Sequence, residues 1–74
     1  MNKDNQHKRI WRYIDTHDAG ITPMDAFIDL QITKLATRVS EMIRLGYPIE
    51  KIPESRVNAL GETVRYTRYR KAAA

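Results

Sequence analysis

Polar and apolar residues in the first part of the chain repeat with the period of an amphipathic helix. Four side chains fall at the i, i+3, i+4 and i+7 spacing of one helix face, namely His7, Ile10, Trp11 and Ile14. The pattern predicts a helix over residues 3–17 with this stripe facing the core. Gly20 follows it and suits the left-handed backbone that often ends a helix.

A second, short helix is predicted over residues 23–30 from its start signal. Thr22 can cap the first turn, Pro23 suits the first helical position, and Asp25 lies where a capping box places its acid. Ile21, just before it, is expected either to pack against this helix or to form one short strand. The residues expected to face the core are Ala26, Phe27 and Leu30.

A third helix is predicted over residues 34–45, with Thr33 as its cap. Its apolar stripe repeats at helical spacing and consists of Leu35, Val39 and Met42. Gly46 closes the helix, and Pro48 prevents its continuation.

The pattern after Pro48 changes to that of a hairpin. Residues 49–52 form a short extended run, residues 53–62 are polar and predict a loop, and residues 63–69 are rich in strand formers. Tyr66 and Tyr69 lie three apart, which breaks strict alternation. A bulge, or one exposed aromatic residue, would explain this spacing, and both alternatives stay open.

Short segments of the chain carry a resemblance to a known family. They are Gly20-Ile21-Thr22-Pro23-Met24-Asp25-Ala26, Leu35-Ala36-Thr37-Arg38-Val39, Gly46-Tyr47-Pro48-Ile49 and Arg68-Tyr69-Arg70. Together with the order of elements, they resemble the small winged helix-turn-helix domains encoded by bacteriophages and prophages, from Gln6 to Tyr69. The resemblance implies an α+β, mainly α fold, three helices followed by a two-stranded antiparallel hairpin wing, and DNA binding. We expect one domain over residues 1–71 and a frayed tail at 72–74, whose alanines are typical of a cloning remnant.

Length and composition exclude several classes of protein. The 74 residues support only a thin core, which leaves little room for a deep catalytic cleft. The absence of cysteine removes disulfides, thiolate catalysis and cysteine-based zinc sites. No run approaches the ~20 apolar residues of a membrane helix, and the first residues lack the apolar core of a signal peptide. We therefore expect a cytoplasmic protein of a bacterial host cell with no membrane partner.

The chain carries a formal net charge of +4, and most of the excess lies in its second half. This distribution favours an anionic partner contacted by that half. A solvated basic face that keeps the protein in solution is the alternative.

The third helix is the candidate reading helix for double-stranded DNA, because the second helix of such a motif lies in the major groove. Opposite its apolar stripe, the side chains expected to point outward are Thr33, Lys34, Thr37, Glu41 and Arg44, with Arg38 on the flank. Lys34 and Arg38 can meet phosphate or guanine, and Thr37 a thymine methyl group or a phosphate. Glu41 either accepts a hydrogen bond from a cytosine amino group or forms an ion pair with Lys34, Arg38 or Arg44 within the helix. A solvated helix face with local ion pairs is the structural alternative.

The wing is the second candidate contact surface. Arg56 and Asn58, expected in its loop, are the candidates for minor-groove or phosphate contact. Thr22 and the N–H groups that begin the second helix could take a phosphate. The capping role alone explains Thr22 equally well.

Enzymatic, cofactor and metal chemistry are not expected. His7 and His17 are too far apart on one helix to share a face, and Ser40 and Ser55 have no nearby histidine in the sequence. No glycine-rich phosphate loop occurs.

Three functions remain open. The first is a phage or prophage transcriptional regulator that binds double-stranded DNA, with self-association on the DNA. The second is an architectural factor of the excisionase kind. The third is a winged helix that binds a host protein instead of DNA. Leu45 beside the outward face and Glu41 within that face favour this third function. Lys34, Arg38 and the wing arginines favour DNA.

Overall fold

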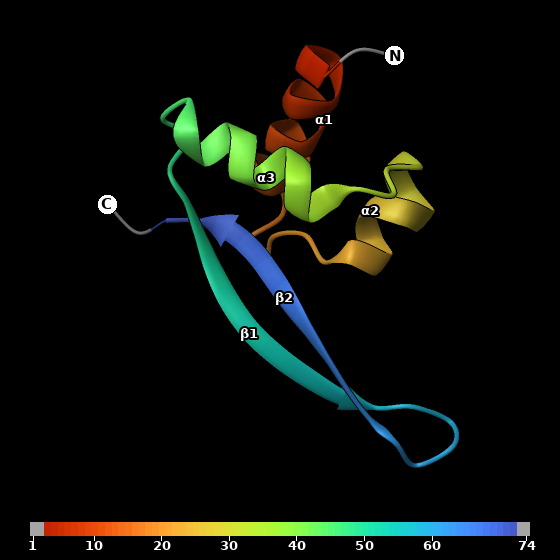
Figure 1. The fold of residues 1–74 in the computed structure, drawn as a ribbon. Helices are drawn as coiled ribbons and strands as arrows, with labels where there is room; N and C mark the ends of the chain where they lie inside the picture. The colour runs from red at the N-terminus through yellow and green to blue at the C-terminus, as the bar shows by residue number, and fades with distance from the viewer. Residues whose placement is uncertain (1–2, 73–74) are drawn as a thin grey trace.

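The computed structural model describes the backbone of residues 3–72 and the side chains of residues 5–72. Its elements follow the predicted order: α1 Lys3–Thr16, α2 Pro23–Leu30, α3 Leu35–Arg44, β1 Ile49–Val57 and β2 Thr63–Lys71. The three helices gather at one end, and the antiparallel hairpin extends away from them (Figure 1). The predicted winged helix-turn-helix architecture is therefore confirmed.

The core lies where the three helices meet the base of the hairpin. Its buried apolar members are Ile10, Ile14, Ile21, Ala26, Ile32, Leu35, Val39, Met42 and Tyr69. Trp11 is half-buried at its border and meets the Tyr47 ring edge-on, with ring centroids 5.3 Å apart. The stripe predicted for α1 thus faces the core as expected.

The start of α2 has the predicted capping box. The Thr22 hydroxyl accepts from the Asp25 N–H at 3.1 Å, and the Asp25 carboxylate accepts from the Thr22 N–H at 3.1 Å. The inward orientation predicted for Phe27 is wrong, because its side chain is 57% exposed. The small Ala26 is the fully buried residue of α2, and Phe27 lies 100° further around the helix, toward solvent.

Two contacts from α1 hold the far end of α2. The Arg9 guanidinium donates to the Leu30 carbonyl at 2.8 Å, and the Tyr13 hydroxyl donates to the Asp29 carboxylate at 2.8 Å. Desolvation by burial and the bond to Asp29 raise the pKa of Tyr13 to about 12. These contacts fix α2, and with it the turn that leads into α3.

The start of α3 differs from the prediction. The helix begins at Leu35 with Lys34 at the N-cap, and no side chain caps it. Thr33 lies one residue too early for this role, so the expectation that it caps α3 is wrong. Gly46 adopts a positive φ of 101° just after the helix, as its place in the sequence predicts.

The hairpin is longer and more regular than predicted. β1 continues through Pro53 to Val57, so the expectation of a loop over residues 53–62 is wrong for its first half. Both strands of a two-stranded sheet are edge strands, which tolerate proline. The register is uniform from Ile49↔Lys71 to Val57↔Thr63, without a bulge in these strands. Tyr69 is buried, and Tyr66, an odd number of residues away, lies on the opposite face.

A short bridge joins the hairpin to the segment before α2. The Ile21 N–H donates to the Tyr69 carbonyl at 2.7 Å, and the Tyr69 N–H donates back at 2.9 Å. Of the two expectations for Ile21, the short strand is confirmed. Gly20 has a φ of 80°, and a Cβ there would collide with the Tyr69 carbonyl and with Arg70, so this close approach needs glycine.

Ala72, the first residue of the predicted tail, is bonded to the turn before β1. The Ala72 N–H donates to the Pro48 carbonyl at 2.8 Å. The rest of the predicted tail, residues 73–74, lies outside the described residues. No helix within residues 3–72 is long and apolar enough to cross a membrane.

Candidate nucleic-acid interface

The outward face of α3 is polar and open to solvent. Its core side is formed by Leu35, Val39 and Met42. The exposed residues on the other sides are Thr33, Lys34, Ala36, Thr37, Ile43 and Arg44, and Ser40 is half-buried. The sequence prediction omitted Ala36 and Ser40, although the same helical projection places Ser40 between Thr37 and Arg44. Small side chains at these positions leave room for a close approach of a partner.

Lys34 and Arg44 are the two cations of α3 that remain available. Both are exposed, and neither makes an ion pair or a hydrogen bond through its side chain with the residues the structure describes. Lys34 stands at the N-terminal end of α3 and Arg44 in its last turn. The two charges therefore flank the exposed Thr37 along one helix face.

Arg38 and Glu41 have a different environment. The side chain of Arg38 is 13% exposed and that of Glu41 is 23% exposed. The Glu41 carboxylate lies 3.2 Å from the Arg38 guanidinium and 2.9 Å from Nε2 of His7 in α1. The expectation that Glu41 points away from the core is therefore wrong, because its flank of α3 faces α1, where His7 gives it a partner.

The polar cluster of His7, Arg38 and Glu41 joins α1 to α3. His7 is buried, and the Arg38 Nε is buried without a hydrogen-bond partner among the described residues. A guanidinium held in this way has less freedom to reach a base than the side chains of Lys34 and Arg44 have. The DNA contacts predicted for Arg38 and Glu41 stay predictions.

The Thr22 side chain caps the start of α2. Its side chain is buried and its hydroxyl is used in the capping box. A phosphate at this end of α2 would have to be met by backbone N–H groups. The phosphate contact predicted for Thr22 therefore stays a prediction.

The candidate wing residues lie in two different settings. Arg56 belongs to β1, opposite Val64, and is exposed. Asn58 lies in the turn, and its amide holds the turn together: Oδ1 accepts from the Leu60 and Glu62 N–H groups at 2.9 and 3.0 Å. Asn58 also donates to the Glu62 carboxylate at 3.1 Å. Arg56 is thus available for contact, whereas the Asn58 side chain is occupied by the turn.

Other wing cations are paired. Arg68 bonds Glu54 at 2.9 Å, Arg70 bonds Glu50, and Lys71 bonds Asp15 of α1 at 3.0 Å. The bond from Arg68, followed by that from Tyr66, lowers the pKa of Glu54, and Glu54 in turn raises the pKa of Arg68. The exposed wing cations outside such pairs, among the described residues, are Lys51, Arg56 and Arg65.

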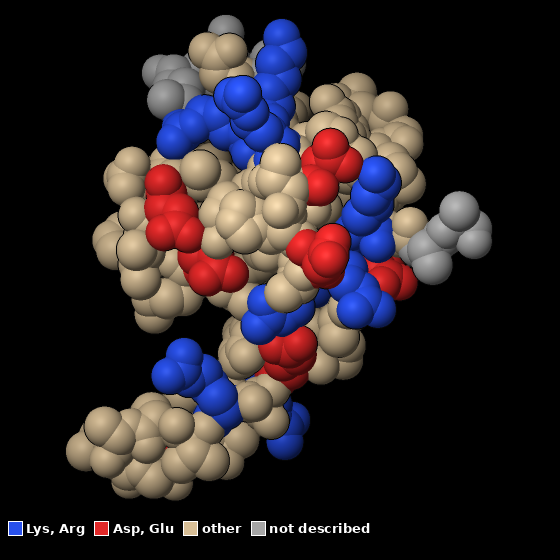
Figure 2. Space-filling view, turned by 180° about the vertical axis from the view of Figure 1, so that it is seen from behind, with Lys and Arg blue, Asp and Glu red and all other residues tan. Residues whose placement is uncertain are grey.

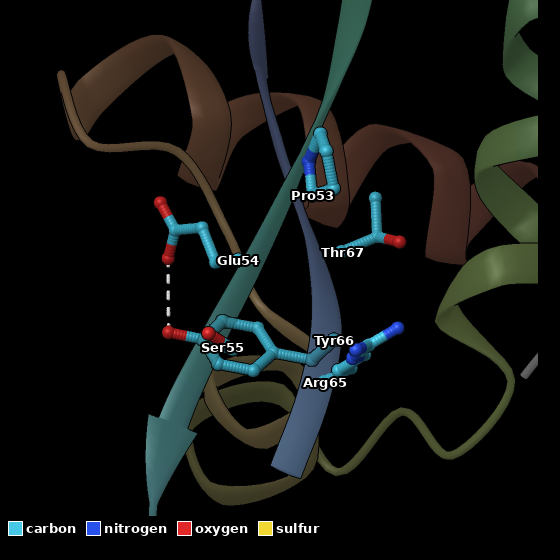
Figure 3. Close-up of a pocket in the computed structure, with 6 residues that line it drawn as sticks. All are labelled: Pro53, Glu54, Ser55, Arg65, Tyr66 and Thr67. Carbon is cyan, nitrogen blue, oxygen red and sulfur yellow. Dashed lines mark hydrogen bonds between the residues drawn. The ribbon is translucent and has the colours of Figure 1, made fainter. Parts of the chain in front are cut away.

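The middle of the hairpin carries a shallow depression of ≈ 580 Å³. Figure 3 shows Glu54 and Tyr66 on one side of the ribbon, joined by a hydrogen bond of 2.9 Å, and Thr67 and Arg65 on the other. The depression is thus spread over both faces of a thin ribbon, and its polar groups do not converge on one point. This arrangement fits a contact surface better than an active site.

Charge is mixed on the side of the molecule away from α3. Figure 2 shows this side, on which Lys and Arg gather at the top of the view and lie beside Asp and Glu further down, while the end of the hairpin is mostly uncharged. Within residues 3–72, no group of His, Asp and Glu could hold a metal ion. The unpaired cations of α3 and of the outer hairpin are candidates for contact with an anion.

The fold agrees with the comparison with known families. The profile described as a winged helix-turn-helix domain matches residues 5–72. The chain therefore belongs to this family, whose members generally bind DNA and are typically not enzymes. Comparisons with curated proteins and with solved structures gave no match.

Proposed function

We propose that this protein binds double-stranded DNA as a small phage or prophage transcriptional regulator in the bacterial cytoplasm. α3 reads the major groove, and the wing contacts the backbone or the minor groove. The observation that carries the proposal is the outward face of α3, where exposed, unpaired Lys34 and Arg44 flank Thr37. The resemblance of the short motifs to phage-encoded domains supports the phage origin.

The side chains of α3 have distinct roles in this proposal. Lys34 and Thr33 meet phosphates or base edges at the N-terminal end of the helix, which is the end that reaches base edges in such motifs. Thr37 contacts a thymine methyl group or a phosphate. Arg44 in the last turn contacts phosphate or guanine, whereas the pairing of Arg38 and Glu41 supports a positioning role for both.

The wing adds contacts of lower sequence specificity. Arg56 contacts phosphate or the minor groove, and Asn58 acts by shaping the turn. One such domain covers few base pairs, so self-association of copies on the DNA would raise the affinity.

The test is fluorescence anisotropy over a salt series, with a random duplex and with duplexes from upstream of the protein's own gene. We expect a log–log salt slope of about −4 to −6, which corresponds to about 4–7 neutralised phosphates. Tighter binding to upstream DNA supports a regulator, and equal binding to both favours the excisionase-like architectural function.

Paired substitutions locate the interface. Lys34→Ala with Arg44→Ala is expected to reduce the salt slope by about 2 and to weaken binding at least about tenfold. Lys8→Ala with Arg12→Ala removes the same charge from exposed positions on α1 and should leave binding within about threefold. Equal losses from the two double variants, with the fold intact, would contradict the assignment of α3.

A second candidate function is binding to a host protein. An apolar arc on α2 favours it, because Met24, Phe27 and Ile28 are all more than half exposed and adjacent on the helix. If wild-type protein binds no duplex even at low salt, this function takes precedence. In that case Phe27→Asp should abolish partner binding, while Lys34→Ala with Arg44→Ala should not.

A further inference from the structure

The apex of the hairpin exposes large apolar side chains. Leu60 is 83% exposed and Val57 is 65% exposed. Figure 1 shows that this part of the hairpin stands clear of the three helices, and Figure 2 shows its end as mostly uncharged. The fold therefore gains little from these side chains, which points to a contact outside the molecule.

The turn that carries Leu60 is tightly built. Asn58 makes two backbone hydrogen bonds within the turn, in addition to those of its side-chain amide. Its N–H donates to the Glu62 carbonyl at 2.9 Å, and its carbonyl accepts from the Gly61 N–H at 3.0 Å. The Asn58 amide also engages the Glu62 carboxylate. Leu60 is thus presented on a fixed turn, so less conformational entropy would be lost when it inserts into a partner.

Cations stand on both faces of the hairpin behind the apex. Arg56 is opposite Val64, and Arg65 is opposite Ser55. Residues paired across the ladder share a face, so these two arginines lie on opposite faces. Both are exposed, and neither has an ion-pair partner among the described residues. An apolar tip with a cation on each side matches a groove that is bordered by two phosphate backbones.

We propose that Leu60 is an apolar wedge, which enters the minor groove and partly unstacks a base step, with Arg56 and Arg65 on the two flanking backbones. The minor groove is about 6 Å wide, and two paired strands with their side chains are wider than this, so only the apex can enter. Leucine is among the residues that unstack base steps and bend DNA when inserted from this groove. Flexible steps such as TA are the preferred targets, because they are easily kinked.

This inference rests on the proposed DNA binding and adds a mode of contact to it. A protein partner for the apex is the competing interpretation. The unpaired arginines favour DNA, because they provide positive charge on both faces of a narrow ribbon. The carboxylate of Glu62, the acidic residue of the turn, accepts a hydrogen bond from the Asn58 side chain.

The test uses short duplexes in which 2-aminopurine replaces adenine at TA steps, with the same base in an A-tract as the reference. Binding of the wild-type protein should raise the 2-aminopurine fluorescence at TA steps. Leu60→Ala should lose most of this rise and weaken binding to TA-containing DNA by about fivefold to tenfold. Leu60→Met should retain the rise. Ile28→Ala, which shortens an apolar side chain at an exposed position on α2, should bind these duplexes as wild type does.

The outcomes separate the two proposals. Wild-type binding without a fluorescence rise, or an equal rise with Leu60→Ala, overturns the wedge and leaves DNA binding intact. The absence of any duplex binding at low salt overturns both. Circular dichroism checks that Leu60→Ala is folded, which is expected for a side chain that is 83% exposed.

Discussion

At the residue scale, Glu41 shows how one partner changes the role of a side chain. Position in the helix alone puts this carboxylate near the reading face. The approach of His7 from α1, together with Arg38 one turn earlier, draws it to the flank that faces α1. The carboxylate therefore supports the contact between α1 and the reading helix, which sets the angle at which α3 is presented.

Glu41→Ala is expected to lower the free energy of unfolding by about 1–3 kcal/mol, because buried His7 and half-buried Arg38 lose their acceptor. Urea unfolding followed by circular dichroism measures the change. Asp18→Ala removes an equal charge from an exposed turn and should change the stability by less than about 0.5 kcal/mol. An unchanged stability in Glu41→Ala, with altered preference for cytosine-containing sites, would instead support base contact by Glu41.

At the element scale, the two helices of the motif begin in different ways. α2 has a complete capping box, whereas α3 begins at Lys34 without a side-chain cap. A lysine has no acceptor to offer the first N–H groups of a helix. In the proposed function, the same lysine provides a cation at the end of α3 that meets DNA, so stability and binding make opposite demands on this position.

Lys34→Ser is expected to raise the free energy of unfolding by about 0.5–1 kcal/mol, because serine can cap the helix. It should also reduce the salt slope of DNA binding by about 1, because one phosphate contact is lost. Lys34→Gln removes the charge without a short capping side chain, so it should weaken DNA binding and leave stability unchanged. Denaturant titration and anisotropy check both effects. Equal stabilities of the two variants would exclude the capping argument, and unchanged DNA binding would exclude Lys34 from the interface.

At the scale of the whole molecule, the small core decides which apolar residues are buried. Helix α2 meets the core through Ala26, and Leu30 packs against its border. The remaining apolar side chains of α2, Met24, Phe27 and Ile28, stay in solvent. A chain of this length has too little interior to cover all sides of an eight-residue helix.

Phe27→Ser should therefore lower the free energy of unfolding by less than about 1 kcal/mol. Leu35→Ala, at a site that is 3% exposed, should lower it by about 2–4 kcal/mol. Thermal and urea unfolding of both variants make the comparison. A loss in Phe27→Ser as large as that in Leu35→Ala would mean that Phe27 is packed in solution, against a second copy or against the core.

Local patterns in the sequence were sufficient for the elements and their order. The spacing of Ile10, Ile14, Leu35, Val39 and Met42 predicted two helices and their buried sides, because helical geometry repeats within a few residues. The capping box of α2 and the left-handed glycines were also predicted, since each depends on neighbours in the sequence. The exposed positions of Lys34, Thr37 and Arg44 followed from the same helical projection.

Contacts between distant parts of the chain decided the rest. The partner of Glu41 lies in α1, 34 residues earlier in the chain. The pairing of Pro53 with Thr67 extends β1 through a segment whose local sequence predicts a loop. The exposure of Phe27 depends on how closely Ala26 lets α2 approach the core. In each case the local sequence did not fix the environment, and the packing of the helices and the hairpin decided it.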